Sequence, residues 1–120
     1  MECSLLYLLQ NYLPMHDRLL QLLELLEETP GDSFLLFALA KEYEKLEDLD
    51  QALDYYLFLE QSHPDYVGLY FHLGKLYETL DQPDRALATY QKGMEIARAQ
   101  NDQHSYSELQ NAKTNLEIGG

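Results

Sequence analysis

The segment that decides the fold is Tyr70-Phe71-His72-Leu73-Gly74-Lys75-Leu76-Tyr77, continued by Ala86-Leu87-Ala88-Thr89-Tyr90. The same outline occurs 34 residues earlier in the chain. Six pairs of positions keep this interval: Leu36/Tyr70, Leu39/Leu73, Ala40/Gly74, Tyr43/Tyr77, Ala52/Ala86 and Tyr56/Tyr90. Self-similarity at a fixed interval of this length is typical of proteins built from structural repeats.

Each copy of the repeat is expected to form two helices. Its apolar residues recur at intervals of three and four, which places them on one face of an amphipathic helix. Small residues at positions 40 and 74 and at positions 52 and 86 indicate that the two helices cross closely, with tyrosine rings filling the space beside the crossing. One helix pair cannot bury its own apolar face, so the copies are expected to stack.

The order aromatic-x2-Leu-Gly-x2-Tyr, then Ala-x3-aromatic, then Pro, resembles the tetratricopeptide repeat (TPR). The resemblance covers about residues 16–117 and is most specific for the two complete copies. It implies an all-α fold in which TPR-like helix-turn-helix repeats stack as a short right-handed α-solenoid.

The expected domain spans residues 15–120. It comprises a cap helix at 16–28, repeats at 33–66 and 67–100, and a C-terminal cap helix at 104–117. Pro30 lies 34 residues before Pro64, which marks residues 16–28 as the second helix of an incomplete repeat. Residues 1–14 are expected to be an N-terminal appendage, or else a short helix packed on the domain; both interpretations stay open.

The charge of the chain narrows the classes of partner. The formal net charge is −13, and nucleic acid and anionic membranes both require a basic surface, so neither is an expected partner. Residues 1–32 carry −5 and residues 33–66 carry −6, so the acidic surface belongs to the N-terminal half. This surface serves solubility, or it steers a basic partner toward the protein.

The expected compartment is the cytoplasm. The single cysteine, Cys3, excludes an internal disulfide and a cysteine-based metal site. No apolar run approaches the ~20 residues that a membrane-spanning helix needs. The leucine-rich start follows Glu2 instead of a basic region, unlike a secretory signal.

Signals for catalysis, metals and cofactors are missing from the sequence. The four histidines do not show the spacing of a zinc site. The acidic run Glu47-Asp48-Leu49-Asp50 lacks the alternation of a calcium loop and suits the solvated start of a helix. No glycine-rich phosphate loop is present, and Cys3 has no basic neighbour that would activate it. We therefore expect no enzyme activity, no metal and no cofactor.

The TPR resemblance implies a concave groove, lined by the first helix of each pair, that holds a peptide or a segment of another protein. The residues at groove positions are Phe34, Phe37, Lys41, Glu44 and Lys45 in the first repeat, and Phe71, Lys75, Glu78 and Thr79 in the second. Stacking at the repeat interval is expected to set Phe37 beside Phe71 and Lys41 beside Lys75. Two aromatic rings and two ammonium groups suit a segment with an apolar anchor and a carboxylate.

An alternative interpretation assigns these side chains to the fold itself. In it, Phe37 and Phe71 pack beneath the end helices, while Lys41 and Lys75 pair with nearby glutamates. One TPR subclass clamps the C-terminal carboxylate of chaperones, but the Lys and Asn that open that clamp would fall at Phe37 and Lys41, so the resemblance does not extend to that activity.

The sequence therefore predicts a non-catalytic adaptor that binds a protein or peptide in the TPR groove. The alternative is a structural role in which the chain forms a homodimer through its N-terminal or capping helices. An enzyme is not expected, because no constellation of residues supports one.

Overall fold

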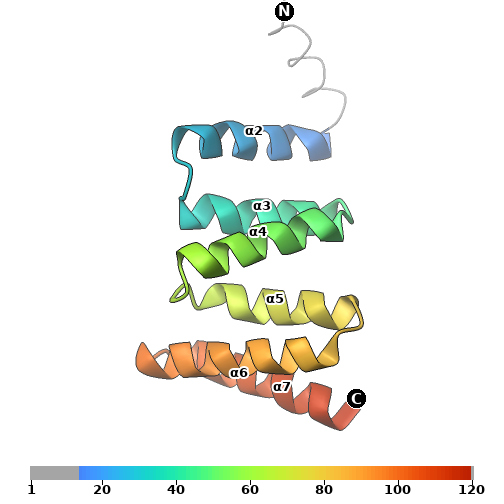
Figure 1. Cartoon of the computed structure of the whole chain (residues 1–120), viewed down its shortest axis with the longest axis vertical. Coiled ribbons are helices and arrows are strands. Elements are labelled where there is room, and N and C mark those ends of the chain that lie inside the picture. Colours follow the sequence, from blue (N-terminus) through green and yellow to red (C-terminus); the bar gives the residue numbers. More distant parts are fainter. Residues whose placement is uncertain (1–13, 120) are drawn as a thin grey trace, which may run out of the picture. The chain divides into compact units, whose positions relative to one another are not determined.

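The computed structural model describes residues 14–119, which form helices joined by short loops (Figure 1). The helices are α2 (Pro14–Glu28), α3 (Ser33–Lys45), α4 (Leu49–Ser62), α5 (Gly68–Thr79), α6 (Pro83–Ala99) and α7 (Gln103–Gly119). No strand occurs between residues 14 and 119. The predicted all-α repeat fold is confirmed. The appendage or short helix expected before Pro14 lies outside the described residues.

Prolines and a glycine lie at the ends of three helices. Pro14 opens α2 instead of preceding it, which suits proline because the first turn of a helix needs no amide hydrogen from it. Pro83 occupies the same kind of position in α6. The helix α7 continues through Gly119.

The chain divides into two compact units. The first unit ends at Phe58 and contains α2, α3 and most of α4. The second unit begins at Leu59 and contains the end of α4 together with α5, α6 and α7.

In the first unit, α2 packs on α3 through leucines. Leu22, Leu35 and Leu39 are buried and form the core, with other leucines of α2 packed around them. The leucine content of α2 predicts burial on several sides, but Leu25 is 48% exposed. That expectation was wrong for this side of the helix, because only the leucines that face α3 enter the core.

In the second unit, α5, α6 and α7 pack closely at two glycines. A Cβ atom on Gly74 would lie 2.2 Å from Cε1 of Tyr90, so the tyrosine ring of α6 lies directly on the backbone of α5. A Cβ atom on Gly93 would lie 2.5 Å from Cβ of Tyr70. The predicted close crossing is confirmed here. At Gly93, side chains of α5 and α7 make the approach.

Left-handed residues end three of the helices. Asn101 has φ 57°, and Asn tolerates this conformation well. Glu47 and Asp81 have φ 61° and 60°, and they occupy equivalent repeat positions. At the start of α3, Asp32 is the N-cap, because its Oδ1 accepts a hydrogen bond from the Leu35 amide at 3.0 Å.

Candidate functional site

The groove positions fall on one helix in each unit. We call Phe34, Phe37, Lys41, Glu44 and Lys45 the α3 face, and Phe71, Lys75, Glu78 and Thr79 the α5 face. The α3 face belongs to the first unit and the α5 face to the second. Their local geometry determines which of these side chains a partner could contact.

Two phenylalanines on the α3 face differ in their surroundings. Phe34 is 66% exposed, although it is a large apolar side chain. Phe37 is half-buried, and its ring meets that of Tyr56 in α4 edge to face, with 6.2 Å between ring centres. Phe37 therefore packs on the second helix of its own repeat while part of its ring faces solvent. Phe34 is the aromatic side chain of this face with the larger exposed fraction.

The basic end of the α3 face is tied to a buried carboxylate. Glu42 is 4% exposed and lies 3.0 Å from Nε of Arg18 in α2 and 3.8 Å from Nζ of Lys45. A buried carboxylate is costly unless it is paired, so these contacts hold α2 on α3. The equivalent position in the second repeat is Leu76, and that mismatch is the signal by which the sequence could have revealed Glu42.

Both faces contain a glutamate held by a tyrosine of the following helix. The Tyr56 hydroxyl donates a hydrogen bond to Glu44 Oε1, and the Tyr90 hydroxyl donates one to Glu78 Oε2. Burial raises the pKa of both tyrosines, and the hydrogen bond and the charge of the glutamate raise it further. The two pairs are separated by the repeat interval, so each repeat builds the same Tyr–Glu contact.

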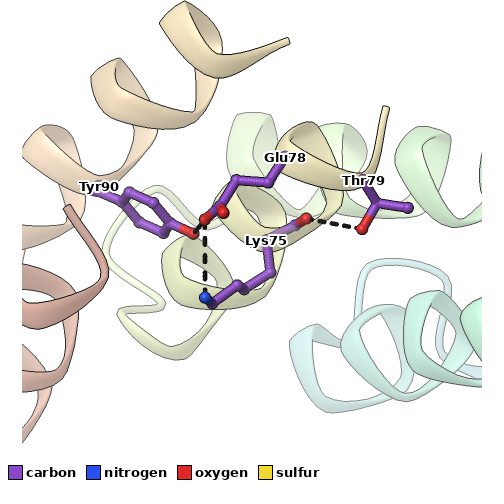
Figure 2. A network of polar contacts seen from close by, with 4 residues as sticks. All are labelled: Lys75, Glu78, Thr79 and Tyr90. Atoms are coloured by element: carbon purple, nitrogen blue, oxygen red, sulfur yellow. Dashed lines mark hydrogen bonds and ion pairs between the residues drawn. The ribbon is translucent and has the colours of Figure 1, made fainter. Parts of the chain in front are cut away.

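Lys75 lies at the centre of the α5 face (Figure 2). Its Nζ is 3.7 Å from Glu78 Oε2 and 5.6 Å from the centre of the Phe71 ring. The Thr79 hydroxyl donates a hydrogen bond of 3.2 Å to the backbone carbonyl of Lys75. Glu78 thus lies between Lys75 and Tyr90, and the lysine side chain is 49% exposed.

This geometry supports part of each interpretation of the faces. The pairing of Lys75 with Glu78 agrees with the structural interpretation. An exposed ion pair of this kind contributes little to stability, at most about 1 kcal/mol, so Lys75 can exchange its partner at little cost. Glu44 and Glu78 differ from the other groove residues, because their hydrogen bonds with tyrosines serve the packing of each helix pair.

Comparison with known proteins identifies the repeat. The sequence model of the tetratricopeptide repeat matches residues 35–57 and 67–100. The crystal structure of a tetratricopeptide repeat domain protein from Salinibacter ruber is 48% identical over 72% of this chain and 96% of that chain, with a TM-score of 0.69. The chain belongs to the tetratricopeptide repeat family.

Two further TPR-like structures share the fold. The solution structure of a protein from Bordetella parapertussis is 25% identical over 84% of this chain and 88% of that chain, with a TM-score of 0.74. PcrH, in complex with the chaperone binding region of PopD, is 16% identical over 96% of this chain and 87% of that chain, with a TM-score of 0.79. No curated protein matches the chain significantly.

Among residues 17–119, no group of three or more His, Cys, Asp or Glu side chains is arranged to hold a metal ion. His104 lies 3.6 Å from Glu108, on the exposed side of α7. Over the same residues, every helix is too short or too polar to cross a membrane.

Proposed function

We propose that this TPR protein is a non-catalytic adaptor that binds a peptide or a segment of another protein through its α3 and α5 faces. The proposal rests on one observation: each face has a large side chain that is exposed to solvent. Phe34 is 66% exposed on α3, and Lys75 is 49% exposed above Phe71 on α5. Proteins of the family generally act as scaffolds, and PcrH is an example of this fold in complex with a region of another protein. The proposal places the adaptor in the cytoplasm.

The chemistry of the faces defines the segment that would suit them. Aromatic side chains contribute most of the affinity at protein interfaces, so Phe34 and Phe71 would contact an apolar anchor. A carboxylate of the segment would compete with Glu78 for Lys75. The Tyr90 hydroxyl would still satisfy Glu78 after the exchange, so the site would not leave a carboxylate without a hydrogen bond.

Affinity capture from the source cells, followed by mass spectrometry, would supply the partner for a titration. We expect Phe34→Ala and Phe71→Ala each to weaken binding of that partner about tenfold or more, as for an interface hot spot. Ile118→Ala is the matched control, because Ile118 is 79% exposed on α7 and belongs to neither face. Affinities of both face variants equal to that of the parent would refute the proposed surface.

Self-association through the capping helices is the second candidate. Leu25 on α2 is 48% exposed and Ile118 on α7 is 79% exposed, and apolar side chains of this size suit an interface between two copies. Light scattering on the purified chain would separate the candidates. A dimer that Leu25→Glu converts to a monomer would favour this second role, whereas a monomer at all concentrations would exclude it.

A further inference from the structure

The first unit contains an open hollow that the proposed function does not use. Its walls come from α2, α3 and α4, and it has a volume of about 330 Å³. The lining residues are Leu26, Leu36, Gln51, Asp54, Tyr55 and Phe58, and we call this site the α2/α4 hollow. None of them belongs to the α3 face, so a ligand of the hollow would contact different side chains.

The second unit shows what the repeat does with the equivalent positions. Its counterparts of Leu26, Leu36 and Phe58 are Glu60, Tyr70 and Lys92, each 34 residues later. In the second unit, the lysine contacts both of the other residues. Lys92 Nζ lies 3.0 Å from Glu60 Oε2 and 5.8 Å from the centre of the Tyr70 ring.

The apolar walls of the hollow are therefore not a requirement of the fold. The second unit has a salt bridge and a cation–π contact at the equivalent positions. The first unit has Leu36 where the second has a tyrosine ring, and it has a phenylalanine, 51% exposed, where the second has a lysine. An exposed aromatic side chain at the edge of an apolar hollow is a recurrent feature of binding surfaces.

The charge around the hollow is negative. Asp54 stands at its edge, where the second repeat has Ala88, and Gln51 replaces Arg85. From residue 17 to Phe58 the first unit has eleven carboxylates and three basic side chains, a net charge of −8. Two of those basic side chains, Arg18 and Lys45, lie against Glu42. A ligand of the hollow therefore meets a strongly negative potential.

We propose that the α2/α4 hollow binds a basic amphipathic segment of another protein. One large apolar side chain of the segment would enter the hollow against Leu26, Leu36 and Phe58. A Lys or Arg nearby in the segment would lie beside Asp54. The volume is at the lower end of the range for binding pockets, about 300–1,000 Å³, which suits a single anchor side chain. Apolar contact would supply the affinity, and charge would select the partner. A second copy of this chain is a poor occupant, because two chains of net charge −13 repel each other.

The probe for this proposal is a fluorescent peptide of Leu and Lys, about 15 residues long, whose leucines follow helical spacing. Fluorescence anisotropy would measure its binding to the parent protein. Three control peptides separate the contributions: Glu in place of Lys, Ala in place of Leu, and the same composition in scrambled order. We expect the Leu/Lys peptide to bind at least tenfold more tightly than any of the three.

Variants of the protein locate the binding site of the peptide. Phe58→Ala should weaken binding at least tenfold, whereas Phe34→Ala should leave it unchanged. Asp54→Asn should weaken binding severalfold at low salt, and high salt should abolish this difference. Circular dichroism would confirm that the variants keep the helical fold, which we expect because both side chains are exposed.

Each other outcome overturns the proposal. Absence of binding to the parent would do so, as would equal binding of the Glu peptide. Equal affinities for Phe58→Ala and the parent would exclude the hollow, and a loss confined to Phe34→Ala would assign the peptide to the α3 face. A dimer by light scattering that dissociates in Phe58→Ala would make a second copy the occupant. The result is independent of the proposed groove function, since Phe34 and Phe58 variants report on the two surfaces separately.

Discussion

Tyr90→Phe removes a single hydroxyl from the contact that positions a groove residue. Tyr90 is fully buried, and its hydroxyl donates a hydrogen bond to Glu78 on α5. The substitution keeps the ring over Gly74, so the packing of α5 on α6 should survive. The decrease in the free energy of unfolding then measures the contribution of the Tyr90–Glu78 hydrogen bond alone.

The expected loss of unfolding free energy depends on the contacts that Glu78 retains in the variant. A hydrogen bond to a charged group contributes about 1.5–3 kcal/mol. Glu78 retains Lys75 at 3.7 Å, and 28% of its side chain is exposed to water, so it is not stranded. We therefore expect the free energy of unfolding to fall by about 1–2 kcal/mol, near the lower end of that range. This change lowers the melting temperature of a domain of this size by about 4–12 °C.

Urea unfolding followed by circular dichroism would measure this change, with an unchanged denaturant slope showing that the fold is preserved. Tyr77→Phe is the matched control, because Tyr77 is also a buried tyrosine of the second unit, 7% exposed. Among residues 17–119, Tyr77 has no counterpart of the contact between Tyr90 and Glu78, so we expect a change within about 0.5 kcal/mol. If Tyr90→Phe melts within a degree or two of the parent, Tyr90 does not hold Glu78 in place.

Three other predictions concern stability. Gly93→Ala should cost about 1–3 kcal/mol by overpacking, because its Cβ would lie 2.5 Å from Cβ of Tyr70, whereas Gly119→Ala, with open space around it, should change thermal unfolding little. Burial raises the pKa of Tyr70 to about 12, and the charges of nearby carboxylates contribute. The folded state thus holds this proton more tightly, so the stabilisation is complete below pH about 10 and is lost between about 10 and 12; Tyr70→Phe should remove that part of the pH dependence in urea titrations. Asp32→Ala removes the cap of the Leu35 amide and should cost about 0.5–2 kcal/mol, measured by the same unfolding assay.

The repeat interval explains why most of the fold could be predicted. Helix ends, the left-handed Asn101 and the close approach at Gly74 all follow from residue types that have one main use at such positions. Left-handed Glu47 could not be predicted, because glutamate does not favour that conformation, whereas aspartate, the residue type at position 81, adopts it more often. Both residues adopt it because each loop must end one helix and start the next within a few residues.

The candidate site was only partly predictable. The periodicity places Glu44 and Glu78 on the first helices, but it does not show that tyrosines twelve residues later donate to them. The constant spacing of Glu and Tyr in both repeats was the available signal. Glu42 pairs with Arg18 of α2, which lies outside the complete repeats, so periodicity alone could not reveal this contact.

The α2/α4 hollow could be found only with coordinates. Leu36 lines it where the second repeat has the larger Tyr70, and a sequence pattern records which residues are apolar but not the space they leave. Leu26 and Phe58 line the hollow, whereas their counterparts Glu60 and Lys92 form a salt bridge. This difference between the repeats has a meaning only once the hollow is known.

The most direct test of the proposed adaptor function is a calorimetric titration of the captured partner against the Lys41→Glu/Lys75→Glu variant at low and high salt. The two lysines share one repeat position and belong to the α3 and α5 faces. We expect the affinity of the variant to be at least about tenfold lower than that of the parent at low salt. The difference in affinity should shrink at high salt, because ions screen the Coulomb interaction. Unchanged affinity at low salt would contradict this expectation and would place the binding surface outside these two faces.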